Sequence, residues 1–280
     1  MANFRHTYEK RKSITMSVPP ILSNKRYMKP SVFTPENLLR EARRQKSLPL
    51  ENVPAICILD PDGDIVRRLV SEKLAEKDPN WACYHTDLFV FTDHNIQFGI
   101  IGCAVGASFA VLVAEELFAS GCELLISVTS AGQIVEMREP PYFVLIEKAL
   151  RDEGTSYHYV PPSEFSAIRP ELLSMFDNVF THAAVQVYHG STWTTDAPFR
   201  ETEAAIDYCR TIGIMGVEME AAGLYAFAEA RQKSVVCLAH VTNRMARMER
   251  DFEKGIAAGS QDALHVIGLV ARAWVEQREK

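Results

Sequence analysis

Hydrophobic positions along most of the chain fall into short continuous runs and into stretches with helical spacing. The short runs predict strands at residues 55–59, 81–92, 95–102, 124–128, 142–147, 183–188, 214–217 and 235–241. Helical spacing and capping signals predict helices at residues 65–77, 108–120, 170–176, 202–211, 221–231 and 260–277. Because strands and helices alternate, and several strands are apolar throughout, we expect an α/β fold: a single domain with a central mixed β-sheet flanked by helices.

The first 52 residues differ in composition from the rest of the chain. They are rich in Lys, Arg, Pro and Ser, and their one clear element is a helix over residues 35–45, with Thr34 as N-cap and Pro35 at the first helical position. We therefore predict an N-terminal arm over 1–52 and one domain over 53–280. The arm either packs on a neighbouring subunit or is a partly ordered extension.

Composition narrows the class of protein. The 280 residues are 47% hydrophobic and 24% charged, enough to bury a sizeable core. A net charge of −6 argues against a partner that is nucleic acid or an anionic membrane, because both attract concentrated Lys and Arg. The six cysteines show no Cys-x-x-Cys pair, the histidines show no metal-binding spacing, and no apolar run approaches ~18 residues. We expect a cytoplasmic protein with reduced cysteines and no metal.

Two acids stand among apolar and small residues at a predicted strand-to-helix junction: Glu218 and Glu220. In α/β sheets, ligands bind at such strand ends. Two interpretations stay open, since a carboxylate there either favours the positive end of the helix dipole or accepts hydrogen bonds from a vicinal diol. The loop over 102–108, which contains Gly106 and Ser108, also follows a strand and opens a helix, so its N–H groups either face an anion or serve packing.

The segment over 216–225 resembles the ribose-binding segment of the nucleoside phosphorylase superfamily, in the branch with uridine phosphorylase, hexameric purine nucleoside phosphorylase and methylthioadenosine/adenosylhomocysteine nucleosidase. Segments 102–108, 127–132, 154–159 and 192–201 share the resemblance, which runs from about residue 54 to the C-terminus. It implies a phosphorylase/hydrolase-like fold and a homo-oligomer, either a dimer or a hexamer. It also implies that Met219 lies beneath the sugar, that Glu220 holds its 2′- and 3′-hydroxyls, and that Ser130 contacts phosphate and sugar.

The remaining candidate residues come from the same resemblance. We expect Glu218, Gly106, Ser108, Arg200 and His158 to contact the substrate. We expect Asn243, Arg244 and Asp196 to lie beside the departing base, and these three residues together with Glu220 form the predicted catalytic set. Each has an alternative role. Asp196 can cap a turn, Arg200 and Arg244 can form surface or interface ion pairs, and His158 can be a hydrogen-bonded core histidine.

Departures from the family pattern concern the phosphate side. Phosphorolytic members hold phosphate with arginines, whereas this chain has Asp62-Gly63-Asp64 in the first turn, Ser127 before the Ser130 strand end, and His85 or Thr86 in the hairpin. Carboxylates repel a phosphate dianion, so phosphate is only a possible co-substrate, and no cofactor is expected. The pair Asn243-Arg244 resembles uridine phosphorylases, in which the arginine helps neutralise a pyrimidine leaving group.

The resemblance implies cleavage of an N-glycosidic bond through an oxocarbenium-like transition state, with electrostatic placement supplying most of the rate. Three hypotheses stay open: ribosyl transfer from a nucleoside, uridine among the possibilities, to phosphate; hydrolysis by water; and binding of a nucleoside without catalysis. The first would make the protein a pentosyltransferase of nucleoside metabolism.

Overall fold

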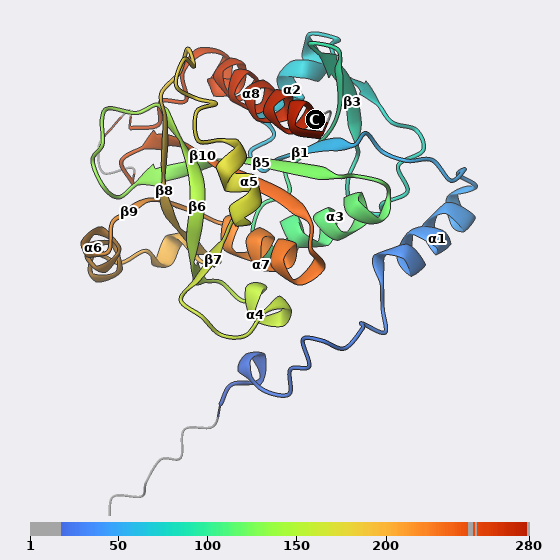
Figure 1. The fold of residues 1–280 in the computed structure, drawn as a ribbon, viewed down its shortest axis with the longest axis horizontal. Helices are drawn as coiled ribbons and strands as arrows, with labels where there is room; N and C mark the ends of the chain where they lie inside the picture. The colour runs from blue at the N-terminus through green and yellow to red at the C-terminus, as the bar shows by residue number, and fades with distance from the viewer. Residues whose placement is uncertain (1–17, 246–248, 250, 279–280) are drawn as a thin grey trace, which may run out of the picture.

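The computed structural model describes residues 18–245, 249 and 251–278 (Figure 1). The strands are β1 (Ile56–Asp60), β2 (Glu76–Lys77), β3 (Phe89–Asp93), β4 (Ile96–Gly102), β5 (Leu124–Gln133), β6 (Tyr142–Asp152), β7 (Phe165–Ala167), β8 (Val187–Thr195), β9 (Ile214–Glu218) and β10 (Ser234–Asn243). The helices are α1 (Pro35–Lys46), α2 (Asp64–Ser71), α3 (Ala107–Ala119), α4 (Ser156–Tyr159), α5 (Pro170–Met175), α6 (Glu203–Thr211), α7 (Ala221–Arg231) and α8 (Ser260–Arg278), with 3-10 turns η1 (Pro20–Leu22), η2 (Pro198–Arg200) and η3 (Ile256–Gly259).

The strands form one mixed sheet, in the order β10-β6-β8-β9-β5-β1-β4-β3-β2, with β7 beside β6. Strands β4, β1, β5 and β10 are mutually parallel along this path of pairings, and β9 runs antiparallel to β5. Because β10 pairs with both β5 and β6, the strands β5, β10, β6, β8 and β9 close into a ring. The expected α/β fold with a central mixed sheet is confirmed.

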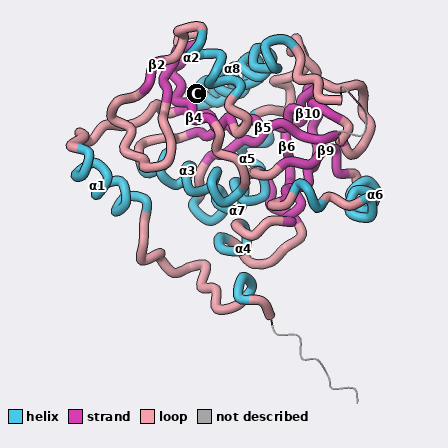
Figure 2. Tube along the Cα trace, turned by 180° about the vertical axis from the view of Figure 1, so that it is seen from behind, coloured by secondary structure: helices cyan, strands magenta, loops and turns pink. Residues whose placement is uncertain are grey.

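Helices cover the sheet on two sides. In Figures 1 and 2, α2 and α8 lie over one side of β1 and β5, and α3 and α7 lie over the other. Helix α7 is buried at every position over 221–228, as expected of a helix that is apolar all round. In the described part of the chain, no helix has both the length and the apolarity needed to cross a membrane.

The helix predicted in the arm is present as α1. Thr34 caps α1 by accepting a hydrogen bond from the main-chain N–H of Asn37 at 3.3 Å. Leu39 and Ala42 of α1 pack against Ala82, so the helix is seated on the body of the protein (Figure 1). The division at residues 52 and 53 stays a prediction, and residues 1–17 of the arm lie outside the described residues.

Strands β5 and β6 each continue five residues beyond the strands predicted over 124–128 and 142–147, and three further predicted boundaries are wrong. The helix predicted over 65–77 ends at Ser71, because Lys73 adopts a left-handed backbone (φ 57°) that a helix cannot continue through. The strand predicted over 183–188 is displaced to β8. The strand predicted over 81–92 begins only at Phe89; its earlier apolar residues lie in a loop whose burial comes from the core and from α1.

Helices α3 and α7 approach most closely at a glycine. A Cβ atom at Gly223 would lie 2.8 Å from the Cβ of Ala107, closer than two carbon atoms can approach. This contact brings the start of α7, which comes directly after Glu220, against the loop that precedes α3.

We predict that Gly223→Ala lowers the free energy of unfolding by about 1–3 kcal/mol, because two helix backbones must separate to admit one methyl group. Thermal and denaturant unfolding measure the loss. Gly268→Ala in α8 is the matched control, since the nearest neighbour of its new Cβ would be the flexible Arg272 guanidinium, at 3.2 Å. An equal effect of the two substitutions would contradict the close approach of α3 and α7.

Candidate functional site

The carboxyl ends of four parallel strands meet at one edge of the sheet. Strand β1 ends at Asp60 opposite Gly102 of β4, and β10 ends at Asn243 opposite Gly132 of β5. Since β9 runs antiparallel to β5 and Val217 pairs with Gly132, the residues after β9 return to this same edge. The fold therefore gathers the ends of segments that are far apart in the sequence.

Glu218 is buried and fully engaged with the protein. One of its carboxylate oxygens accepts hydrogen bonds from the hydroxyls of Thr192 (3.1 Å) and Thr194 (2.5 Å) of β8. The other accepts from the main-chain N–H groups of Glu220 and Ala221, each at 2.7 Å. With four donors and an exposed fraction of 3%, this carboxylate joins β8 to the start of α7.

Glu220 faces the loop before α3. Its Oε1 accepts a hydrogen bond from the main-chain N–H of Gly106 at 2.7 Å, and Oε2 is 3.3 Å from the N–H of Met219. Gly106 takes a positive φ of 85° at this point, which turns the N–H toward the acid. Met219 is half-buried beside it, so the predicted sugar-side residues Glu220 and Met219 lie against Gly106 of the predicted anion-facing loop.

Glu218 and Glu220 are neighbouring buried acids, so ionising both costs more free energy than ionising one. Burial raises the pKa of the Glu220 carboxyl to about 7, and the neighbouring Glu218 charge contributes to this rise. Burial also raises the pKa of Glu218, but its four donors favour the ionised form. We assign the charge to Glu218 and the proton, below pH 7, to Glu220.

Ser130 belongs to an acidic network at the same edge. Its hydroxyl donates to the Asp62 carboxylate in the turn after β1. The Lys254 ammonium bridges Asp62 (2.9 Å) and Asp64 (2.5 Å), and Arg67 donates to Asp64 at 2.6 Å. The sequence interpretation missed Lys254, because no spacing signal links it to a turn nearly the whole domain away. This network occupies the side where the family resemblance implies phosphate.

The predicted base-side residues are held by contacts of their own. The side-chain oxygen of Asn243 accepts from the N–H of Met245 at 2.9 Å, and Arg244 pairs with Glu139. Asp196 is exposed and accepts from the N–H of Gly154 at 2.8 Å. Arg200 is exposed on η2. None of these contacts joins one predicted base-side residue to another.

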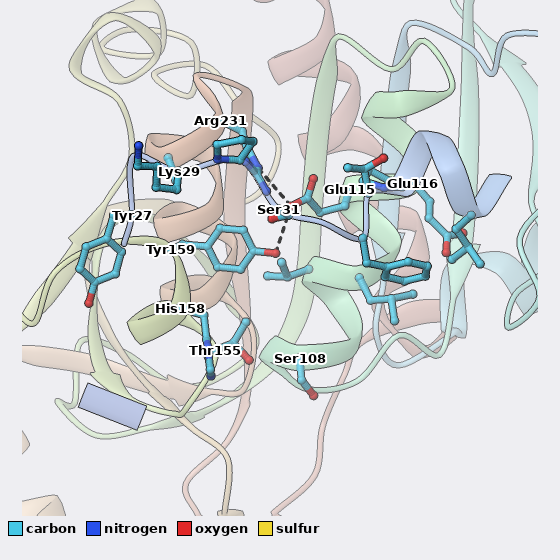
Figure 3. Close-up of a pocket in the computed structure, with 18 of the residues that line it drawn as sticks. Tyr27, Lys29, Ser31, Ser108, Glu115, Glu116, Thr155, His158, Tyr159 and Arg231 are labelled. Carbon is cyan, nitrogen blue, oxygen red and sulfur yellow. Dashed lines mark hydrogen bonds and ion pairs between the residues drawn. The ribbon is translucent and has the colours of Figure 1, made fainter. Parts of the chain in front are cut away.

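Ser108 and His158 line a separate cavity, of about 780 Å³, between the arm and helices α3, α4 and α7 (Figure 3). Its lining includes neither Met219 nor Glu220. Figure 3 shows the Tyr159 hydroxyl and the Arg231 guanidinium both directed at Glu115, at 3.1 and 3.2 Å. His158 is 2.8 Å from the Lys25 ammonium, so it helps to hold the arm.

Comparison with known proteins identifies the family of this chain. Residues 55–272 match the family model described as the Phosphorylase superfamily. The chain is 25% identical over 167 residues to a DeoD-type purine nucleoside phosphorylase of Psychromonas ingrahamii, covering 58% of this chain and 70% of that protein. The corresponding protein of Shewanella denitrificans is 26% identical over 167 residues, which again cover 58% of this chain and 70% of that protein.

A solved structure of uridine phosphorylase from Vibrio fischeri ES114 has the same fold. It superposes with a TM-score of 0.64 at 20% identity, over 89% of this chain and 97% of that one. A second structure of that enzyme gives a TM-score of 0.61 at 21% identity, over 80% and 89%.

We predict that Glu218→Gln destabilises the protein by roughly 1–3 kcal/mol, since an amide group must turn N–H atoms toward buried donors. Chemical unfolding measures the change. Glu229→Gln, which changes an exposed glutamate of α7, should leave stability unchanged. If both variants unfold alike, the four-donor network does not anchor the start of α7.

Proposed function

Because the chain belongs to the phosphorylase superfamily, we propose that it is an enzyme that cleaves the N-glycosidic bond of a nucleoside. The observation that carries the proposal is the buried Glu220 carboxyl at the sheet edge, held against the Gly106 N–H group. Glu218 beneath it is already saturated with donors, so Glu220 is the acid of the pair with capacity for a substrate.

The geometry of Glu220 suits a ribose diol. A carboxylate offers about four lone-pair positions, and Gly106 and Met219 supply only main-chain N–H groups to two of them. The Thr129 hydroxyl, which also hydrogen-bonds this carboxylate, would give way to the two ribose hydroxyls. As the N-glycosidic bond breaks, the sugar becomes cationic, and a fixed negative charge in a buried position stabilises it more than it stabilises the neutral substrate.

The departing base leaves with the electron pair of the broken bond and needs a positive or hydrogen-bonding partner. Asn243 ends β10 opposite Gly132, Arg244 follows it, and we propose both for this role. Arg244 would exchange its ion pair with Glu139 for the base. Asp196 and Arg200, which come after β8, are further candidates on this side.

Two nucleophiles, phosphate and water, are compatible with this arrangement of residues. Phosphate is the first, because the similar proteins are named phosphorylases, and Lys254 and Arg67 are cations at the matching side. A specific observation favours water as the second. Asp62 already accepts the Ser130 hydroxyl and shares Lys254 with Asp64, so an entering dianion meets two carboxylates. Asp62 would take the proton as the water oxygen bonds to the sugar carbon.

We predict that Glu220→Gln lowers kcat/KM for nucleoside cleavage by about 100-fold or more, because an amide neither carries charge nor accepts two hydroxyls as well. In the wild type the Glu220 pKa of about 7 means that activity rises as pH increases through 7, when the acid ionises. The variant should lose this rise. Glu229→Gln is the control, and a variant that keeps both rate and pH profile would contradict the assignment.

The nucleophile is tested by measuring free base released from a panel of purine and pyrimidine nucleosides, with and without phosphate. We expect base to be released. Strict phosphate dependence, with a lower KM for phosphate in Asp62→Asn because a repelling charge is removed, identifies phosphorolysis. Phosphate-independent release that falls roughly 100-fold in Asp62→Asn identifies water. Asp87→Asn, an exposed acid paired with Lys77, is the control. Nucleoside binding without release would refute both.

A further inference from the structure

A cluster of three different metal-ligating side chains lies outside the candidate site. The Sγ of Cys83, a ring nitrogen of His85 and a carboxylate oxygen of Glu116 all lie within 4.8 Å of one another. Cys83 and His85 stand in the loop before β3, and Glu116 stands in the last turns of α3. Because the two segments are distant in the sequence, no motif spacing could reveal the cluster.

Glu116 is the most unusual member. Its exposed fraction is 1%, and neither carboxylate oxygen has a hydrogen-bond partner within the described residues. The ammonium of Lys46 is nearby but donates to the main-chain carbonyls of Ala82 (3.1 Å) and Cys83 (2.6 Å) instead. A buried acid of this kind needs a proton, a donor such as the neighbouring Cys83 thiol, or a cation.

The sulfur of Cys83 has two hydrogen-bond donors of its own. It accepts from the main-chain N–H of His85 at 3.3 Å and from the Thr86 hydroxyl at 3.4 Å. The indole N–H of Trp81 donates to that same hydroxyl oxygen at 3.0 Å, which directs the Thr86 proton toward the sulfur. Outer hydrogen bonds of this kind orient and stabilise the thiolate ligand of a metal.

We propose that Cys83, His85 and Glu116 bind one Zn²⁺ ion. A thiolate, an imidazole and a carboxylate together suit zinc, and three protein ligands leave a fourth position for water. Zinc bonds of about 2.0–2.3 Å require the ligand atoms to approach to roughly 3.3–3.8 Å. His85 is exposed and supplies this movement by rotating its side chain. The two other ligands are buried, so the ion enters from the His85 side.

The ion would join the loop before β3 to helix α3 beside the seat of α1. Lys46, in the last turn of α1, binds the carbonyls of Ala82 and Cys83, and Leu39 and Ala42 pack on Ala82. Zinc would therefore fix the surface on which the arm helix rests, and it would act apart from the acids of the candidate site.

The test uses the full chain, freed of metal by a chelator and titrated with Zn²⁺ and with Co²⁺ as a spectroscopic probe. We expect one ion per chain, a rise in Tm with zinc, and a cobalt spectrum with a thiolate charge-transfer band. Cys83→Ser should abolish that band, and His85→Ala and Glu116→Gln should each weaken binding at least 10-fold. Cys103→Ser and His94→Ala, which change an exposed thiol and an exposed imidazole, are the matched controls.

The proposal is overturned by no binding by the wild type, by cobalt binding without a thiolate band, or by equal losses in the controls. His85→Ala keeps the test valid if a buried variant fails to fold, because this exposed side chain is not part of the core. If Glu116→Gln binds zinc as the wild type does, the buried acid is satisfied by a proton instead, and the site is refuted.

Discussion

The arrangement of the strand-end edge depends on one buried carboxylate. Glu218 accepts two hydroxyls from β8 and two main-chain N–H groups at the start of α7, and Thr194 in turn accepts from the N–H of Ala222 at 2.9 Å. The first turn of a helix has N–H groups without partners, and here an acid of the preceding strand satisfies them. The direction of α7 and the position of Glu220 are therefore set by the same four bonds.

This constraint has a chemical consequence for Glu220. Burial, together with a saturated and charged neighbour, makes a second buried charge costly and raises the Glu220 pKa to about 7. At neutral pH the acid lies close to its midpoint, so ionisation requires little free energy. A sugar that gains positive charge in the transition state would draw the acid into its ionised form. Stabilisation that grows as the bond breaks lowers the barrier, whereas equal stabilisation of substrate and transition state does not.

The sequence predicted the features that are encoded locally. The cap at Thr34, the helical stripes of α3 and α8, and the strand-to-helix junction at Glu218 all depend on residues a few positions apart. The features that the sequence did not predict depend on residues that are far apart along the chain. Closure of the strands into a ring, the bridge from Lys254 to Asp62, and the burial of Cys83 in a loop arise from segments that meet only in the fold. Periodicity contains no information about such meetings, and apolar loop residues therefore resembled a strand.

The helix N-termini at this edge bear on whether phosphate or water would act as the nucleophile. Asp60 accepts the N–H groups of Gly63 (3.1 Å) and Val66 (2.9 Å) at the start of α2, and Glu220 accepts the N–H of Gly106 before α3. These are the main-chain donors that an anion would use. Phosphate would have to displace the protein's own acids from them or rely on Lys254 and Arg67, which are already paired with acids. Water requires neither change, because it needs only an acceptor for its proton. Under the proposed function, the carboxylates at this edge therefore support water as the nucleophile, although the similar proteins are named phosphorylases.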